Sequence, residues 1–164
     1  QKLTAGHFSV DLTGVEVGEI VEQTILDCEP FADKFGVKVR MNSPSEPVYV
    51  SADRQRLHQV MTNLLSNASK FSPRGATIDV EVGIIGRQCE IAVSNKGAGI
   101  SPEFEKRIFQ PFSQQADHLT RSREGTGLGL AICKQLVENM NGEIGFTSIP
   151  NISTTFWVRL PLQL

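Results

Sequence analysis

The apolar positions of this chain recur at helical spacing over residues 53–72. Seven apolar side chains fall on one arc when the stretch is placed on an α-helix: Leu57, Val60, Met61, Leu64, Leu65, Ala68 and Phe71. Ser51 or Asp53 can cap the start of this helix, and Ser72 ends it before a proline. The pattern therefore predicts an amphipathic helix at the centre of the fold.

In the other stretches, apolar residues recur either every three to four positions, as in a helix, or every second position, as in a strand. Helical spacing predicts further helices at 16–34, 102–108 and 125–140, and alternation predicts strands at 8–12, 37–41, 48–50, 77–85, 88–94, 143–148 and 154–160. Short turns join 77–85 to 88–94 and 143–148 to 154–160, which is typical of antiparallel hairpins. Helices combined with a mostly antiparallel sheet predict an α+β, two-layer α/β sandwich.

One row of polar side chains on the central helix is a candidate for chemistry. Asn63, Asn67 and Lys70 are spaced so that they stack along one line beside the apolar stripe. Asparagine is a poor helix former, so two of them in the middle of a helix need a reason. Two carboxamides and an ammonium group could hold a hydrated divalent cation and a phosphate chain. A solvated face formed by chance is the alternative interpretation.

Two glycine-rich loops are the other candidates for chemistry. NKGAGI at 95–100 follows a predicted strand, and GTGLGL at 125–130 opens the last predicted helix. The chain contains no Walker loop, G-x-x-x-x-G-K-[ST]. Neither loop matches the dinucleotide fingerprint G-x-G-x-x-G, because Pro102 and Leu130 occupy the third glycine positions. Backbone N–H groups at a glycine-rich helix start can still approach phosphates. A tight turn with close packing is the alternative.

Composition narrows the class of protein. With 164 residues, 40% of them hydrophobic and 21% charged, the chain suits one globular domain. A net charge of −2 gives no broad electrostatic footprint for nucleic acid, so no nucleic-acid partner is expected. Cys28, Cys89 and Cys133 are far apart and surrounded by apolar residues. They are expected to be free core thiols in a reducing, intracellular compartment.

The order of the motifs adds information that no single motif carries. An Asn-x-x-x-Asn-x-x-Lys helix, a Gly-x-Gly loop after a strand, a polar segment at 113–124 and a Gly-x-Gly-x-Gly helix start follow one another. Together they resemble the ATP-binding catalytic domain of sensor histidine kinases, in the superfamily shared with gyrase, Hsp90 and MutL. RLHQVMTNLLSNASKFS resembles the N box, NKGAGI the G1 box, FQPF the F box and GTGLGLAICKQLVENMNGEI the G2 box.

The resemblance implies a Bergerat ATP-binding fold, in which helices cover one face of a mixed, mostly antiparallel sheet. That domain would span residues 8–164, and residues 1–7 would be the end of a linker from a missing dimerisation and phosphoacceptor domain. It also implies ATP and Mg²⁺ as cofactors, with a lid over 113–124. The residues implied to bind the nucleotide are Asn63, Asn67, Lys70, Phe71, Asn95, Gly97, Gly99, Ile100, Arg121, Gly125, Thr126, Gly127, Leu128 and Gly129.

Individual roles follow from the same resemblance. Asn67 is implied to bind Mg²⁺ with support from Asn63, and Lys70 to contact the phosphates. Phe71 would stack near adenine, beside a pocket wall shaped by Gly97 and Gly99. The glycines of 125–129 would cradle phosphates, and a lid arginine, Arg121, would reach the γ-phosphate. Lys70 and Arg121 could instead be solvated charges.

Position 63 separates branches of the superfamily. The ATPase members carry a glutamate there as a general base, whereas the amide of Asn63 cannot take a proton. Phosphoryl transfer to an acceptor is therefore favoured over hydrolysis. His7, His58 and His118 are not followed by an acidic residue, as the family's phosphorylated histidine is. His58 is expected to point to solvent, and His118 to belong to the lid.

The acceptor histidine is therefore expected on the dimerisation domain of the same protein. A downstream response regulator or receiver domain would then receive the phosphoryl group. The fragment would be a monomer and the full protein a homodimer, with this domain in the cytoplasmic part of a membrane-bound sensor.

The sequence departs from the family pattern in three places. Asn95 stands where an aspartate accepts the adenine amino group, Glu124 replaces a usual glycine, and the tip of the last hairpin lacks glycines. Losing the charge at position 95 predicts roughly tenfold weaker ATP binding. Two functions remain open: an ATP-dependent phosphoryl-transfer domain of a sensor kinase, or a degenerate pseudokinase module that docks on a partner kinase and regulates it.

Overall fold

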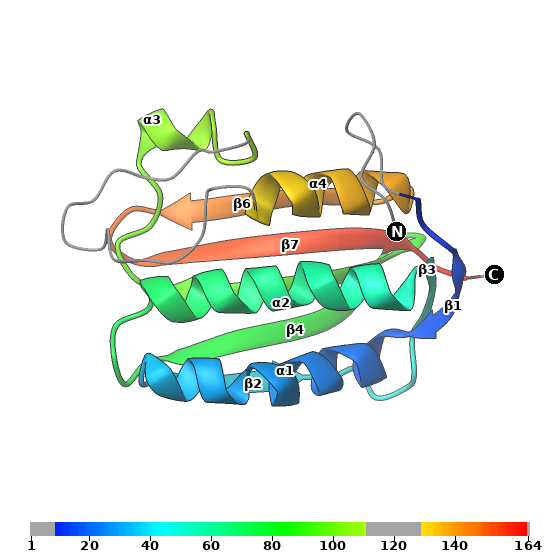
Figure 1. The fold of residues 1–164 in the computed structure, drawn as a ribbon, viewed down its shortest axis with the longest axis horizontal. Helices are drawn as coiled ribbons and strands as arrows, with labels where there is room; N and C mark the ends of the chain where they lie inside the picture. The colour runs from blue at the N-terminus through cyan, green and yellow to red at the C-terminus, as the bar shows by residue number, and fades with distance from the viewer. Residues whose placement is uncertain (1–8, 111–128, 164) are drawn as a thin grey trace.

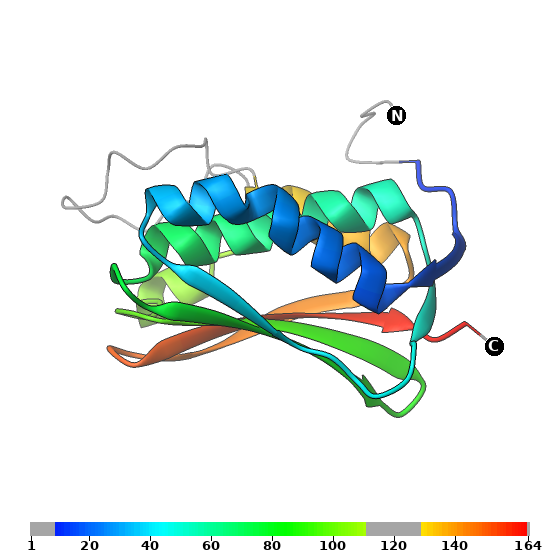
Figure 2. The same ribbon diagram turned by 90° about the horizontal axis from the view of Figure 1, so that it is seen from below.

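The computed structural model describes residues 9–110 and 129–163, which form a sheet with helices over one of its faces (Figure 1, Figure 2). The elements in chain order are β1 (Thr13–Glu16), α1 (Val17–Lys34), β2 (Lys38–Asn42), β3 (Tyr49–Ala52), α2 (Arg54–Phe71), β4 (Thr77–Ile85), β5 (Gln88–Lys96), α3 (Pro102–Glu105), α4 (Gly129–Asn139), β6 (Glu143–Ile149) and β7 (Ser153–Pro161). The predicted α+β two-layer sandwich is confirmed.

The main sheet has five strands in the order β2-β4-β5-β7-β6. β2 and β4 pair in parallel, and the three other neighbouring pairs are antiparallel. The parallel pair follows from connectivity, because the chain passes through β3 and α2 between β2 and β4. β1 and β3 form a separate antiparallel pair beside the starts of α1 and α2 (Figure 1).

The core lies between this sheet and three helices, of which α2 is the middle one (Figure 1). The predicted stripe on α2 is buried from Leu57 to Ala68, and no member of it is more than 5% exposed. Phe71, at the last position of the helix, is 44% exposed, so the arc stops being buried there. The sheet contributes the alternate residues of its strands, including Ile78, Val80, Ile91, Val158 and Leu160.

Most predicted elements match, and the differences have local causes. The strand expected at 8–12 is wrong for its described residues, because β1 runs from Thr13 to Glu16 and pairs with the four residues of β3. Instead of a strand partner, the Asp53 carboxylate accepts the Asp11 N–H at 2.8 Å. The helix expected at 102–108 keeps its helical form only over Pro102–Glu105.

The three cysteines are buried free thiols, as predicted. Burial raises the pKa of Cys89 and that of Cys133 to about 12. Both thiols therefore stay protonated at neutral pH and act as small apolar groups.

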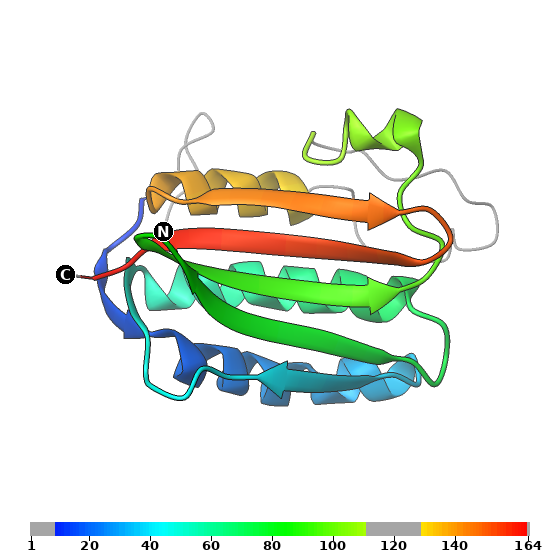
Figure 3. The same cartoon turned by 180° about the vertical axis from the view of Figure 1, so that it is seen from behind.

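The sheet face that the helices leave uncovered (Figure 3) carries polar and aromatic side chains, among them Arg159, Trp157 and Arg40. The Arg159 side chain pairs with Glu90 at 2.9 Å, and its guanidinium lies 4.2 Å from the centre of the Trp157 ring. The Trp157 ring in turn covers Gly145 on β6, where a side chain would collide with it. Arg40 and Asp79 pair at 2.7 Å on the same face. Cross-strand contacts of this kind stabilise an open face without apolar burial.

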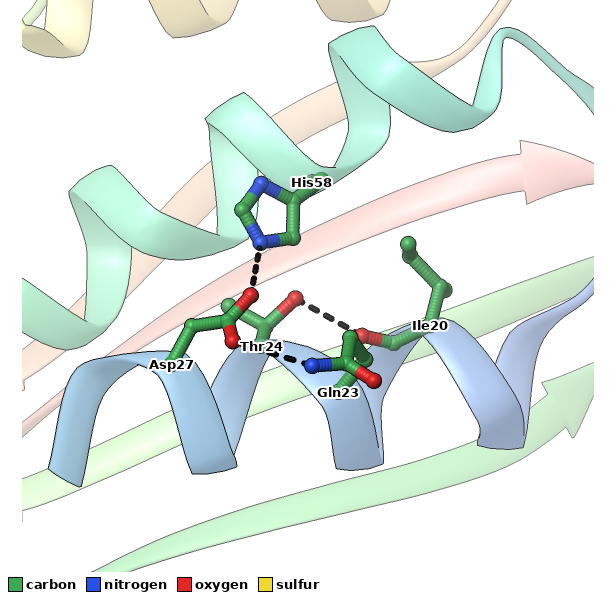
Figure 4. Close-up of polar contacts among 5 residues, drawn as sticks. All are labelled: Ile20, Gln23, Thr24, Asp27 and His58. Atoms are coloured by element: carbon green, nitrogen blue, oxygen red, sulfur yellow. Dashed lines mark hydrogen bonds and ion pairs between the residues drawn. The ribbon is translucent and has the colours of Figure 1, made fainter.

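A polar contact joins α1 to α2 on the outer side of the helical layer (Figure 4). His58 Nε2 lies 2.9 Å from Asp27 Oδ2, and Gln23 Nε2 donates to Asp27 Oδ1 at 2.9 Å. Thr24 beside them donates its hydroxyl to the Ile20 carbonyl at 2.7 Å. His58 lies on the outer side of α2 with its side chain 35% exposed, and it also contacts α1, a contact that the sequence did not predict. The ring bridges the two helices.

This contact predicts a pH dependence. The hydrogen bond from His58 and then the one from Gln23 lower the pKa of Asp27 below 3.8. The charged carboxylate therefore contributes stability above the unfolded pKa of 3.8, and that contribution is lost as pH falls through the folded pKa. Asp27→Asn should lower the urea midpoint at neutral pH, and its difference from wild type should shrink in acid. Asp33→Asn, on the same helix, is the control, and a difference independent of pH would contradict the prediction.

Substituting Asp53, which caps the start of α2, is expected to lower stability more than substituting Asp27. Asp53 is 7% exposed, and its two oxygens accept from Arg56 N at 3.1 Å and from Asp11 N at 2.8 Å. Asp53→Ala removes both acceptors and should lower the free energy of unfolding by about 2 kcal/mol in urea titrations. Asp53→Asn keeps one acceptor and should lose about half as much. Asp11→Ala is the control, since only the backbone of Asp11 is used, and an equal loss there would refute the assignment.

Candidate functional site

A row of polar residues crosses the helix-facing side of the sheet at one end. Asn95 on β5, Thr154 on β7 and Ser148 on β6 are direct cross-strand neighbours. Asn95 and Thr154 are only 8% and 6% exposed. The next row on the same face is apolar and consists of Val93, Phe156 and Phe146. Polar groups are thus concentrated where β5 ends and the first glycine loop begins.

The glycine loop, residues 97–100, lies on the β6–β7 hairpin. Gly97 N–H donates to the Ile152 carbonyl at 3.2 Å, and the Ala98 carbonyl accepts from Asn151 N–H at 2.8 Å. Ile100 N–H donates to Ser148 Oγ at 2.8 Å. The loop is therefore held to the turn between β6 and β7 and, through Ser148, to the end of β6.

The same loop also contacts the end of α2. A Cβ on Gly97 would lie 2.7 Å from the Phe71 carbonyl oxygen, so the backbone approaches too closely for any side chain. Asn67 and Lys70 on the last turns of α2 are half-buried, and Phe71 is partly exposed. The loop and these three residues therefore lie at the same end of the domain.

Asn63 connects α2 to the start of α4. Its Nδ2 donates to the Gly129 carbonyl and to Cys133 Sγ, both at 3.4 Å. Asn67 and Lys70 follow one and two turns later, toward the glycine loop. The line of Asn63, Asn67 and Lys70 predicted on α2 therefore runs from the first turn of α4 to the glycine loop.

A small apolar cluster packs against the loop. Ile100, Phe104 and Ile108 are its buried members, and Phe109, Phe146, Phe156 and Leu130 pack against them. Ser101 caps α3 by accepting from Phe104 N at 3.2 Å, which turns Phe104 into the cluster. Phe109 meets Phe156 edge-on at a centroid distance of 6.3 Å. The first half of FQPF thus supports the loop, and its second half lies outside the described residues.

Several predicted site residues lie outside the described part of the chain. They are Arg121, Gly125, Thr126, Gly127 and Leu128, together with the segment 113–124, His7 and His118. Of the second glycine motif the structure describes Gly129, whose carbonyl contacts Asn63.

Thr154 and Ser148 belong to this cluster and were not singled out from the sequence. A signal for Thr154 was present, since alternation over 154–160 places it in phase with the inward residues Phe156, Val158 and Leu160. A threonine at a buried position of a strand needs a partner. Ser148 offers one, with its Oγ 3.5 Å from Thr154 Oγ1.

The polar side chains described at this site carry amides, hydroxyls and, at Lys70, an ammonium group. Asn95 donates through Nδ2 to the Lys96 carbonyl at 3.1 Å, a bond that does not use its amide oxygen. Among residues 9–110 and 129–163 there is no group of three or more His, Cys, Asp or Glu side chains that could hold a metal ion. In the same ranges, no helix combines the length and apolarity of a membrane span.

Comparison with known proteins gives a family. The model of the "Histidine kinase-, DNA gyrase B-, and HSP90-like ATPase" family matches residues 52–164. Sensor-like histidine kinase SenX3 of Mycobacterium tuberculosis is 36% identical over 151 residues, covering 92% of this chain and 37% of that protein. Sensor protein GacS of Pseudomonas syringae is 35% identical, covering 98% of this chain and 18% of that protein. The chain thus spans well under half the length of these relatives.

Solved structures agree with the sequence relatives. The catalytic domain of histidine kinase ThkA superposes with a TM-score of 0.80 at 25% identity, covering 93% of this chain and 96% of that one. Full-length ShkA in complex with AMPPNP superposes with a TM-score of 0.81 at 27% identity, covering 94% and 32%. The chain therefore belongs to the histidine kinase-, DNA gyrase B- and HSP90-like ATPase family, as an ATP-binding domain of the histidine kinase type.

Proposed function

We propose that this chain is the catalytic domain of a two-component sensor histidine kinase and transfers the γ-phosphoryl group of Mg²⁺-ATP to a histidine on a separate dimerisation domain. The observation that carries the proposal is the line of Asn63, Asn67 and Lys70 between the start of α4 and the glycine loop. Amides and an ammonium group along one line suit a metal-bound phosphate chain. The buried amide of Asn95 at the end of that line suits a base edge.

The donor set fits Mg²⁺ that arrives with the nucleotide. Mg²⁺ takes oxygen ligands, keeps several waters and is commonly held by one or two protein oxygens together with phosphates. Asn67 supplies one neutral oxygen on a half-buried turn of α2. The described residues contain no carboxylate cluster that would hold the ion by itself. When bound, the ion would neutralise charge on the phosphates during transfer.

Asn63 supports transfer over hydrolysis. Its amide has no basic nitrogen, and it is engaged with the Gly129 carbonyl and the Cys133 thiol. A water next to it would therefore meet no proton acceptor at that position. The role left for Asn63 is to hold the start of α4 against the line of phosphate-facing groups on α2.

Position 95 governs recognition of the base. The Asn95 side chain is buried at the end of β5, next to Thr154. Its amide oxygen can accept from the amino group of adenine, although it lacks the charge of an aspartate. Phe71 and the glycines at 97 and 99 would form the walls around the base.

The partners are those of a sensor kinase. The dimerisation domain of the same protein would supply the acceptor histidine, and a response regulator or receiver domain would take the phosphoryl group onward. The full protein would be a homodimer with this domain on the cytoplasmic side of a membrane-bound sensor. Because the amide of Asn95 is neutral, a second function is also proposed: a pseudokinase module that regulates a partner kinase by docking.

Calorimetric titration with a non-hydrolysable ATP analogue tests the proposal. Wild type should bind the analogue with Mg²⁺, and Asn67→Ala should bind it about tenfold more weakly or worse, because a metal ligand is lost. Without Mg²⁺ the two proteins should bind alike. Gln55→Ala, which removes an exposed amide from the first turn of the same helix, is the control. No binding by wild type at millimolar analogue would leave the pseudokinase function.

Restoring the charge at position 95 should strengthen binding. In Asn95→Asp the acceptor becomes ionised, which should increase affinity for the analogue about tenfold. Asn42→Asp adds the same charge at an exposed position on β2 and should leave affinity unchanged. Equal effects of the two substitutions in the same titration would show that net charge acts, and would reject a specific contact at Asn95.

A further inference from the structure

The glycine loop is tied to the β6–β7 hairpin by three hydrogen bonds. Two of them are backbone to backbone, from Gly97 N to Ile152 O and from Asn151 N to Ala98 O. These two persist whatever side chains the hairpin carries. The third, from Ile100 N to Ser148 Oγ at 2.8 Å, depends on one side chain. Ser148 is therefore the residue whose substitution would remove one of the three hydrogen bonds between the loop and the hairpin.

The Ser148 hydroxyl has a second neighbour in the buried row. Its Oγ lies 3.5 Å from Thr154 Oγ1 on the neighbouring strand. Thr154 is 6% exposed and is paired in register with Asn95 on its other side. A hydroxyl has two lone pairs and one proton, so Ser148 can accept from Ile100 N–H and still share a hydrogen bond with Thr154. One side chain thus contacts both the loop and the row beneath it.

The fit between loop and strand is close at the same point. Gly99 has a φ of +83°, and a Cβ there would lie 2.9 Å from Ser148 Oγ and 3.2 Å from the Ile149 carbonyl oxygen. The loop has no side chain at this position to pack into the core. The position of the loop is set by its hydrogen bonds together with the burial of Ile100, which is 8% exposed in the apolar cluster, and the Ser148 bond is the one made by Ile100 itself.

We propose that Ser148 is a positioning residue of the nucleotide site. Its hydroxyl holds the Ile100 end of the loop against β6, beside Thr154, so the wall of the base pocket is formed before the ligand arrives. A preformed wall raises affinity because less ordering is left to the binding step. This inference rests on the proposed function, and Ser148 acts through Ile100 without contacting the nucleotide.

The test compares three variants. Ser148→Ala removes the hydroxyl, and Ser148→Thr restores one at the same position. Ser94→Ala is the matched control, because Ser94 Oγ and Thr155 Oγ1 form a 2.7 Å hydroxyl pair between β5 and β7 on the opposite face. For each protein, calorimetry with Mg²⁺ and the non-hydrolysable ATP analogue gives affinity. Urea unfolding gives stability, and amide hydrogen exchange by NMR reports on the Ile100 N–H.

Ser148→Ala should bind the analogue about threefold to tenfold more weakly and exchange the Ile100 amide faster. Ser148→Thr should recover both properties. Ser94→Ala should match wild type in affinity and in Ile100 exchange, even where it loses as much stability as Ser148→Ala. An equal loss of affinity in Ser94→Ala and Ser148→Ala, or no recovery in Ser148→Thr, would overturn the positioning role.

Hydrogen exchange at the Ile100 amide tests this inference independently of the proposed function. Absence of analogue binding by wild type would overturn the proposed function, and the Ile100 amide would still report on the loop. An Ile100 exchange rate that is the same in wild type and Ser148→Ala would then overturn the role of Ser148 in holding the loop.

Discussion

The packing of α2 between two helices and the sheet is the constraint on which the rest of this domain depends. Its stripe from Leu57 to Ala68 is buried against all of them, so the rotation of the helix about its axis is fixed. Asn63, Asn67 and Lys70 lie at helical spacing beside that stripe. Their direction is therefore a consequence of core packing, and the polar line needs no separate support. Apolar burial, the dominant favourable term in folding, thereby orients the polar groups.

The polar row at the end of the sheet obeys a second rule. Burying a hydroxyl or an amide costs free energy unless it is hydrogen-bonded. Asn95 is satisfied in part by the Lys96 carbonyl, Thr154 lies beside Ser148, and Ser148 accepts from Ile100. The polar groups buried at this end of an otherwise apolar face thus have partners in the backbone, in one another and, for Ser148, in the loop. The same contacts shape the proposed base pocket.

Periodicity predicted the architecture because α2, α1 and the two hairpins carry strong patterns, and the order of motifs predicted the family. The strand predicted at 8–12 is not formed by residues 9–12: Val10 packs against the core, Leu12 is exposed, and the Asp11 N–H donates to the Asp53 carboxylate and not to a neighbouring strand. The contact between His58 and Asp27 was not predicted, because a residue on the outer side of one helix can still meet a residue of the neighbouring helix. Ser148 and Thr154 could not be assigned together, since only strand register brings them side by side.

The position of the aromatic side chain on β7 has a practical consequence. Trp157 is the only tryptophan of the chain, and it lies on the sheet face opposite the helices, over Gly145 and under Arg159. The five-stranded sheet therefore separates this fluorophore from the Asn95–Thr154 row. Its fluorescence is therefore expected to depend on the strands around it more than on a ligand at the helix-facing side of the sheet. The fluorescence of Trp157 can therefore be used to follow the unfolding of the sheet from the face opposite the proposed nucleotide site.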